Sequence, residues 1–132
     1  MWDPHTPYDT PREFGNPFKN DPTEEWVTEE LIKNQRSSFG PHSAREVPGY
    51  DDDLGDKYTM GVGSINNVAD AKEQIDAYDT GINYADFYLN KVVEDLKKLN
   101  IWDDTAIIIS ADHGENQGEL NVWGDHQTAD HI

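Results

Sequence analysis

A short stretch near the carboxyl end of the sequence gathers side chains that can hold a cation. In ADHGE, Asp112 and His113 follow a run of apolar residues, and Gly114 allows a sharp backbone turn beside a ligand. Adjacent oxygen and nitrogen donors suit a divalent cation, so Asp112 and His113 are candidate metal ligands. In the competing structural interpretation, Asp112 caps a turn and His113 is a surface side chain.

Two further clusters carry histidines that could contact a substrate. His126 lies in GDHQTADH, close to the candidate metal ligands, and His131 lies five residues further on. His5 is flanked by prolines in DPHTPY, and a histidine in such a stiffened loop is well placed to touch a ligand. Packing of His5 against Tyr8 is the alternative.

The elements that must position these residues are a long helix and a strand. Apolar residues recur at spacings of three and four and predict a helix over 67–100, with Asn67 as its cap. A coiled coil is the alternative interpretation of this spacing of apolar residues. The run 105–111 predicts a strand covered on both faces, opening a strand and metal-site loop over 105–132. Helix, short turn and buried strand are typical of an α/β fold with a parallel sheet, and sites in such sheets lie at the carboxyl ends of strands.

The amino-terminal half is predicted to contain one shorter helix between two loops. Residues 1–20 hold four prolines and predict an extended loop on the substrate side. Asp21 and Pro22 predict a helix over 21–36 that buries Trp26, Val27 and Leu31. Residues 37–66 predict a loop that wraps a site or packs on further structure. One strong strand cannot form a sheet, so we expect the chain to be part of a larger fold.

The composition limits the partners. The formal charge of −17 repels nucleic acid and anionic membranes, so neither is an expected partner. The sequence has no cysteine, no apolar run long enough to span a bilayer and no secretory signal. Taken as it stands the chain would remain in the cytoplasm, and a longer precursor would open the periplasmic or secreted alternatives.

The order of these motifs resembles the sulfatases of the alkaline phosphatase superfamily: DPHTPY, a long amphipathic helix, a strand ending in ADHGE, then GDHQTADH. The resemblance implies that 1–132 is an incomplete catalytic domain. It would form part of an α/β/α sandwich, with one long helix packed on a mostly parallel sheet. It implies that Asp112 and His113 bind a divalent cation, usually calcium. It also implies that His5 and His126 contact the sulfate group of a small-molecule or carbohydrate sulfate ester.

The sequence departs from that family's pattern at the nucleophile. The family uses a formylglycine made from the Cys or Ser of a C/S-x-P-x-R motif, and no such motif occurs here. We therefore expect no turnover by this chain alone, and marginal stability or self-association. Two alternatives remain open: a phosphodiester or phosphonate monoester hydrolase of the same superfamily, and a non-catalytic acidic domain that binds a cation.

Overall fold

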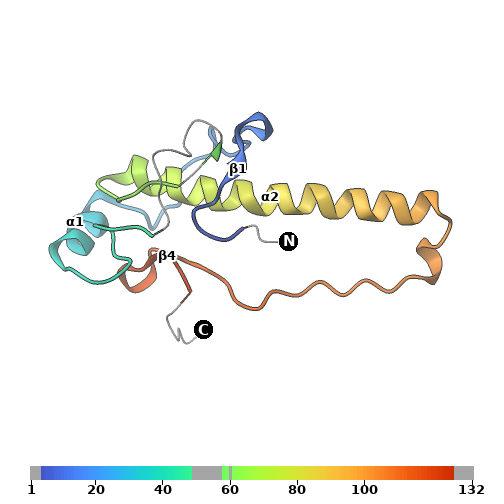
Figure 1. The fold of residues 1–132 in the computed structure, drawn as a ribbon. Helices are drawn as coiled ribbons and strands as arrows, with labels where there is room; N and C mark the ends of the chain where they lie inside the picture. The colour runs from blue at the N-terminus through green and yellow to red at the C-terminus, as the bar shows by residue number, and fades with distance from the viewer. Residues whose placement is uncertain (1–3, 49–57, 60, 127–132) are drawn as a thin grey trace.

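The computed structural model describes residues 4–48, 58–59 and 61–126 (Figure 1). In these ranges the secondary structure consists of two α-helices, short 3-10 turns and very short strands. In chain order the helices and strands are β1 (Thr10–Pro11), α1 (Glu29–Ser37), β2 (Tyr58–Thr59), α2 (Val68–Lys98), β3 (Asn116–Gln117) and β4 (Trp123–Asp125).

Helix α2 dominates the molecule and confirms the long helix predicted over 67–100. Asn67 caps it by accepting a hydrogen bond from the backbone N–H of Asp70 at 3.0 Å, which satisfies one of the unpaired donors of the first turn. Its buried side chains all come from its first half, between Ala71 and Gly81. The second half extends beyond the loops that cover the first half, and the chain turns at its far end and runs back toward β4 (Figure 1). No helix among the described residues is long and apolar enough to cross a membrane.

Helix α1 begins later than the sequence predicts. The expected start at Asp21 is wrong, because Thr28 is the cap and accepts a hydrogen bond from the N–H of Leu31 at 3.1 Å. Of the three residues expected to be buried, Val27 is 6% exposed, whereas Trp26 is 47% exposed and Leu31 is half-buried. The helix buries Ile32 and Gln35 instead.

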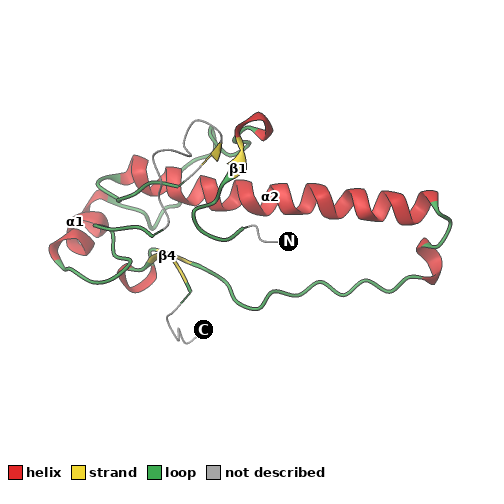
Figure 2. Ribbon diagram, viewed as in Figure 1, coloured by secondary structure: helices red, strands yellow, loops and turns green. Residues whose placement is uncertain are grey.

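The strand predicted over 105–111 is not formed. These residues are extended but pair with no strand in the described part of the chain, and Figure 2 draws the segment as loop. The apolar run is not covered on both faces, since Ile108 is 92% exposed and Ile109 is 74% exposed. An isolated strand has no partner for its backbone groups, so sequence preference alone cannot make it part of a sheet.

The described residues contain two small antiparallel sheets and no parallel one. β1 pairs with β2, and β3 pairs with β4 in a hairpin across Gly118. The hairpin lies within the predicted metal-site loop and was not foreseen, because its strands are short and β3 is polar. The mostly parallel sheet expected from the family resemblance is therefore absent from the described residues.

A small core holds the site end of the molecule together. It joins α1, the loop after it, the first turns of α2 and β4; its buried members are Val27, Ile32, Ala44, Val47, Ile65, Ala71, Ile75 and Trp123. The predicted loop 37–66 supplies three of these residues, so it packs on the helices over the part that the structure describes.

Candidate functional site

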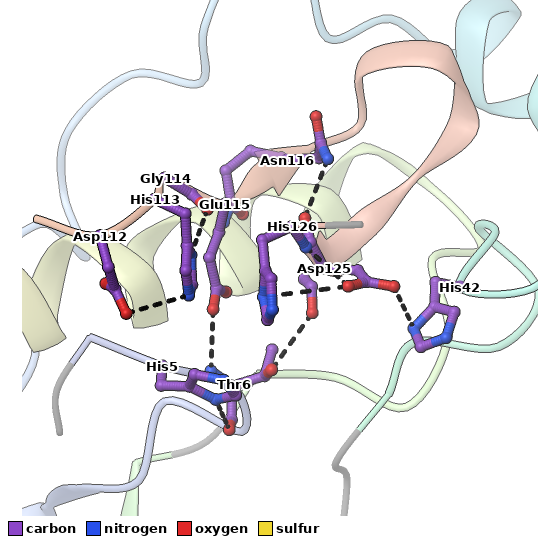
Figure 3. Close-up of polar contacts among 12 residues, drawn as sticks. His5, Thr6, His42, Asp112, His113, Gly114, Glu115, Asn116, Asp125 and His126 are labelled. Carbon is purple, nitrogen blue, oxygen red and sulfur yellow. Dashed lines mark hydrogen bonds and ion pairs between the residues drawn. The ribbon is translucent and has the colours of Figure 1, made fainter. Parts of the chain in front are cut away.

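Three histidines from distant parts of the chain meet beside the base of the hairpin (Figure 3). The rings of His113 and His126 are stacked with centroids 3.8 Å apart. The ring of His5 lies edge-on to both, with its centroid 5.6 Å from that of His126 and 6.3 Å from that of His113. Three of the four predicted site residues therefore lie together, although more than a hundred positions separate His5 from the other two.

Glu115 joins the loop that carries His5 to the loop that carries His113. Its carboxylate accepts a hydrogen bond from the Tyr8 hydroxyl at 2.6 Å and from the backbone N–H of Thr6 at 3.4 Å. Gln117 Nε2 in turn donates to the Tyr8 hydroxyl oxygen at 2.8 Å. Burial, with the Glu115 carboxylate beside it, raises the pKa of Tyr8 far above its usual range, so the hydroxyl remains a donor.

The hairpin places His126 through Asp125, whose side chain is buried. The backbone N–H of His126 donates to Asp125 Oδ1 at 2.6 Å, and His42 Nδ1 lies 3.0 Å from Asp125 Oδ2. Thr6 donates its hydroxyl to the carbonyl oxygen of Gly124 at 3.2 Å, so the His5 loop also contacts the hairpin directly. Gly124 has φ +64°, and a Cβ there would stand 2.7 Å from Thr6 Cγ2, so both the turn and this approach need glycine.

Trp123 anchors the hairpin to α1. Its side chain is fully buried, and its indole N–H donates to Gln35 Oε1 at 3.0 Å. Gln35 Nε2 donates to the carbonyl oxygen of Gly118 at 2.7 Å, so one buried amide holds both strand β4 and the turn after β3. A helix outside the site thus sets the position of the His126 backbone.

Asp112 and His113 lie side by side at the exposed edge of this cluster. Asp112 Oδ2 lies 3.9 Å from His113 Nε2, and Figure 3 shows both side chains directed toward the His5 loop. The Asp112 side chain is 92% exposed, which leaves room for further donors. Calcium takes about six to eight mainly oxygen ligands, so these two residues fit such an ion only as part of its coordination.

The sequence patterns gave no role to Glu115, Asp125 or His42, and named Tyr8 only as a packing partner of His5. Tyr8, Glu115 and Asp125 nevertheless lie inside the three motifs. The spacing of these residues in the sequence does not predict their contacts, because Tyr8 and Glu115 meet only through the tertiary fold. His131, the alternative to His126, lies outside the described residues.

Comparison with known proteins identifies the family. The model of the sulfatase family matches residues 2–131. The chain belongs to the sulfatase family. It is 28% identical over 120 residues to choline-sulfatase of Rhizobium meliloti (strain 1021), a match that covers 91% of this chain and 21% of that protein. No solved structure matches significantly.

Membership supports the coarse expectations drawn from the motifs. Sulfatases are sulfuric ester hydrolases with an alkaline-phosphatase-like α/β fold, and they generally use a divalent metal ion and a formylglycine. The chain spans about a fifth of the length of the relative that it matches, 21%, so the activity of the whole protein does not follow from these residues alone.

Proposed function

We propose that this chain forms the sulfate-binding side of a sulfuric ester hydrolase. The convergence of His5, His113 and His126 carries the proposal, because a family member needs hydrogen-bond donors and a cation around one sulfate group. The substrate would be a small-molecule or carbohydrate sulfate ester.

The side chains divide into two roles in this proposal. Asp112 and His113 would hold a divalent cation, with calcium the expected ion, which when bound offsets negative charge on the sulfuryl oxygens. His5 and His126 would donate hydrogen bonds to the sulfate oxygens as charge develops during cleavage of the ester bond. Their ring centroids are 5.6 Å apart, which is close enough for both rings to donate to one sulfate group lying beside them.

Glu115 and Tyr8 would keep that geometry fixed before the substrate arrives. Two hydrogen bonds from the His5 loop end on the Glu115 carboxylate, so His5 cannot swing away from His113 without breaking them. Preorganised donors stabilise a transition state more than donors that must first move into place. The formylglycine nucleophile would come from residues outside this chain, because no C/S-x-P-x-R motif occurs in it.

The test compares metal content with kinetics in an active enzyme that contains these 132 residues. Asp112→Ala is expected to lose the metal and the activity together. His5→Ala and His126→Ala are expected to keep the metal and hydrolyse sulfate esters about 100-fold more slowly or worse, as for removal of one transition-state donor. Full metal occupancy and a normal rate in Asp112→Ala would refute the assignment.

The substrate class is tested in the same enzyme with a matched panel. Sulfate esters of an aryl alcohol, a sugar and choline are compared with the corresponding phosphodiesters and phosphonate monoesters. A clear preference for the phosphorus esters would refute the sulfatase assignment and favour a phosphodiester or phosphonate monoester hydrolase of the same superfamily.

A further inference from the structure

His5, Glu115 and His126 form a second group of potential ligands, separate from the Asp112–His113 pair. One donor atom from each of the three lies within 4.8 Å of the other two. A tetrahedral zinc site with bonds of about 2.0–2.2 Å places its ligand atoms about 3.4 Å apart. Small side-chain rotations would therefore bring the three donors onto one ion.

The chemical nature of these donors selects the ion. Two imidazole nitrogens and one carboxylate form a set that suits zinc and neighbouring transition metals, whereas calcium prefers oxygen throughout. Two histidines with one glutamate are also a ligand set of zinc enzymes, which leaves a fourth position open for water.

Groups behind the three donors already hold them in ligand orientations. His5 Nδ1 lies 2.7 Å from the carbonyl oxygen of Thr6, which favours the tautomer with its proton on Nδ1 and its lone pair on Nε2. The Tyr8 hydroxyl donates to one oxygen of Glu115, and Asp125 Oδ1 lies 3.9 Å from His126 Nδ1. Backbone carbonyl, hydroxyl and carboxylate groups support metal-binding residues in the same way.

We propose that His5, Glu115 and His126 bind a transition-metal ion of the zinc type, in competition with the sulfate ester. The competition rests on the proposed function, because it assumes that His5 and His126 also contact sulfate. Binding of the ion does not depend on it, since the donors belong to this chain. The cation site at Asp112 and His113 and the zinc site would then be neighbours, because the rings of His113 and His126 are stacked, but they would respond to different ions.

The experiment uses the 132-residue chain and titrates it with Zn²⁺ by calorimetry, with Ca²⁺ in parallel. One equivalent of Zn²⁺ is expected to bind. His5→Ala, Glu115→Gln and His126→Ala are each expected to lower the affinity about 100-fold or more, because loss of a supporting group behind a ligand already costs roughly 10–100-fold. Asp112→Asn is expected to weaken Ca²⁺ binding and leave Zn²⁺ binding unchanged.

Two controls keep the result interpretable. Glu46→Gln removes an exposed carboxylate outside the site and is expected to bind Zn²⁺ normally. In the unaltered chain, imidazole ¹⁵N spectra are expected to show the signals of His5 and His126 shifting with Zn²⁺ while that of His42 stays in place, which needs no variant to fold. Absence of stoichiometric Zn²⁺ binding, or a shift of His42 without His5 and His126, would overturn the proposal.

Inorganic sulfate separates the two proposals. If Zn²⁺ binds but sulfate neither weakens it nor perturbs His5 and His126 in a metal-free sample, the zinc site stands and the sulfate-binding role fails. If sulfate perturbs both histidines and Zn²⁺ does not bind, the sulfate-binding role stands and the zinc site fails.

Discussion

The two halves of α2 have similar apolar patterns but different surroundings. In the first half, Ile75 and Ala77 are buried against the loops that form the site. In the second half and the segment that follows it, large apolar side chains are exposed to solvent: Phe87, Tyr88, Val92, Leu99, Ile101, Trp102, Ile107, Ile108 and Ile109. The site end is packed by the chain's own core residues, whereas the far end presents an exposed apolar surface.

The largest expected effect comes from removing the anchor of the site end. Trp123→Ala is expected to lower the free energy of unfolding by about 3–5 kcal/mol, because it leaves a cavity in the core. The substitution also leaves the buried Gln35 Oε1 without the indole N–H that donates to it. Ile108→Ala, in the exposed segment, is expected to change the free energy of unfolding by less than about 0.5 kcal/mol. Denaturant unfolding of both variants measures the contrast, and equal losses would show that the two ends are equally packed.

The exposed far end is expected to drive self-association of the chain. Replacing Ile108 and Ile109 together by lysine should weaken association by tenfold or more, since burial of each isoleucine contributes about 1.5–3 kcal/mol and tenfold corresponds to about 1.4 kcal/mol. Sedimentation velocity measures the change. A chain that is monomeric before substitution would contradict this role of the segment.

The contact between Tyr8 and Glu115 predicts how the stability of the site end depends on pH. The pKa of Tyr8 is raised above its ordinary value of 10.0, so the folded chain keeps a proton that the unfolded chain loses at alkaline pH. The free energy of unfolding should therefore be unaffected by this group below pH 10 and fall above it, by at most about 1.4 kcal/mol per pH unit.

Tyr8→Phe isolates that contribution. The variant should be less stable than the unaltered chain at neutral pH, and its stability should fall less steeply above pH 10. Part of the slope should remain, because burial also raises the pKa of Tyr78. Identical slopes in the two proteins, measured by denaturant unfolding at each pH, would show that the Tyr8 proton is not held by the fold.

The smallest effect compares the two ends of α2 directly. Asn67→Ala removes the cap and should cost about 1 kcal/mol, because the N–H of Asp70 loses its partner. Lys98→Ala breaks the ion pair with Asp95, whose side chain is 68% exposed, and should leave stability unchanged within error. A larger loss for Lys98→Ala would mean that the far end contributes more than its exposure indicates.

Sequence patterns predicted the parts that depend on local chemistry. The period of the apolar residues and the cap at Asn67 located α2, and the motif residues His5, His113 and His126 do lie together. The prediction of a strand over 105–111 was wrong because a strand needs a neighbouring strand to pair with. The described residues do not supply that neighbour. The predicted start of α1 was wrong because Thr28 and Asp21 are both residue types that cap helices well, and only packing decides between them.

Contacts between distant loops were beyond the reach of the sequence. The meeting of Tyr8 with Glu115, and of Asp125 with His42, depends on the hairpin and on the approach of Thr6 to Gly124. None of these pairs has a fixed spacing that a pattern could detect. The site residues were therefore predictable by type, and their supporting contacts were not.

The central claim is that His5 and His126 contact the same sulfate group. Titration of the Ca²⁺-supplemented, zinc-free chain with inorganic sulfate, followed through the imidazole ¹⁵N signals, tests it most directly, with chloride at equal ionic strength as the control. The signals of His5 and His126 are expected to shift together with one dissociation constant, while that of His42 does not move. Separate dissociation constants, or a response to chloride as large as that to sulfate, would contradict it.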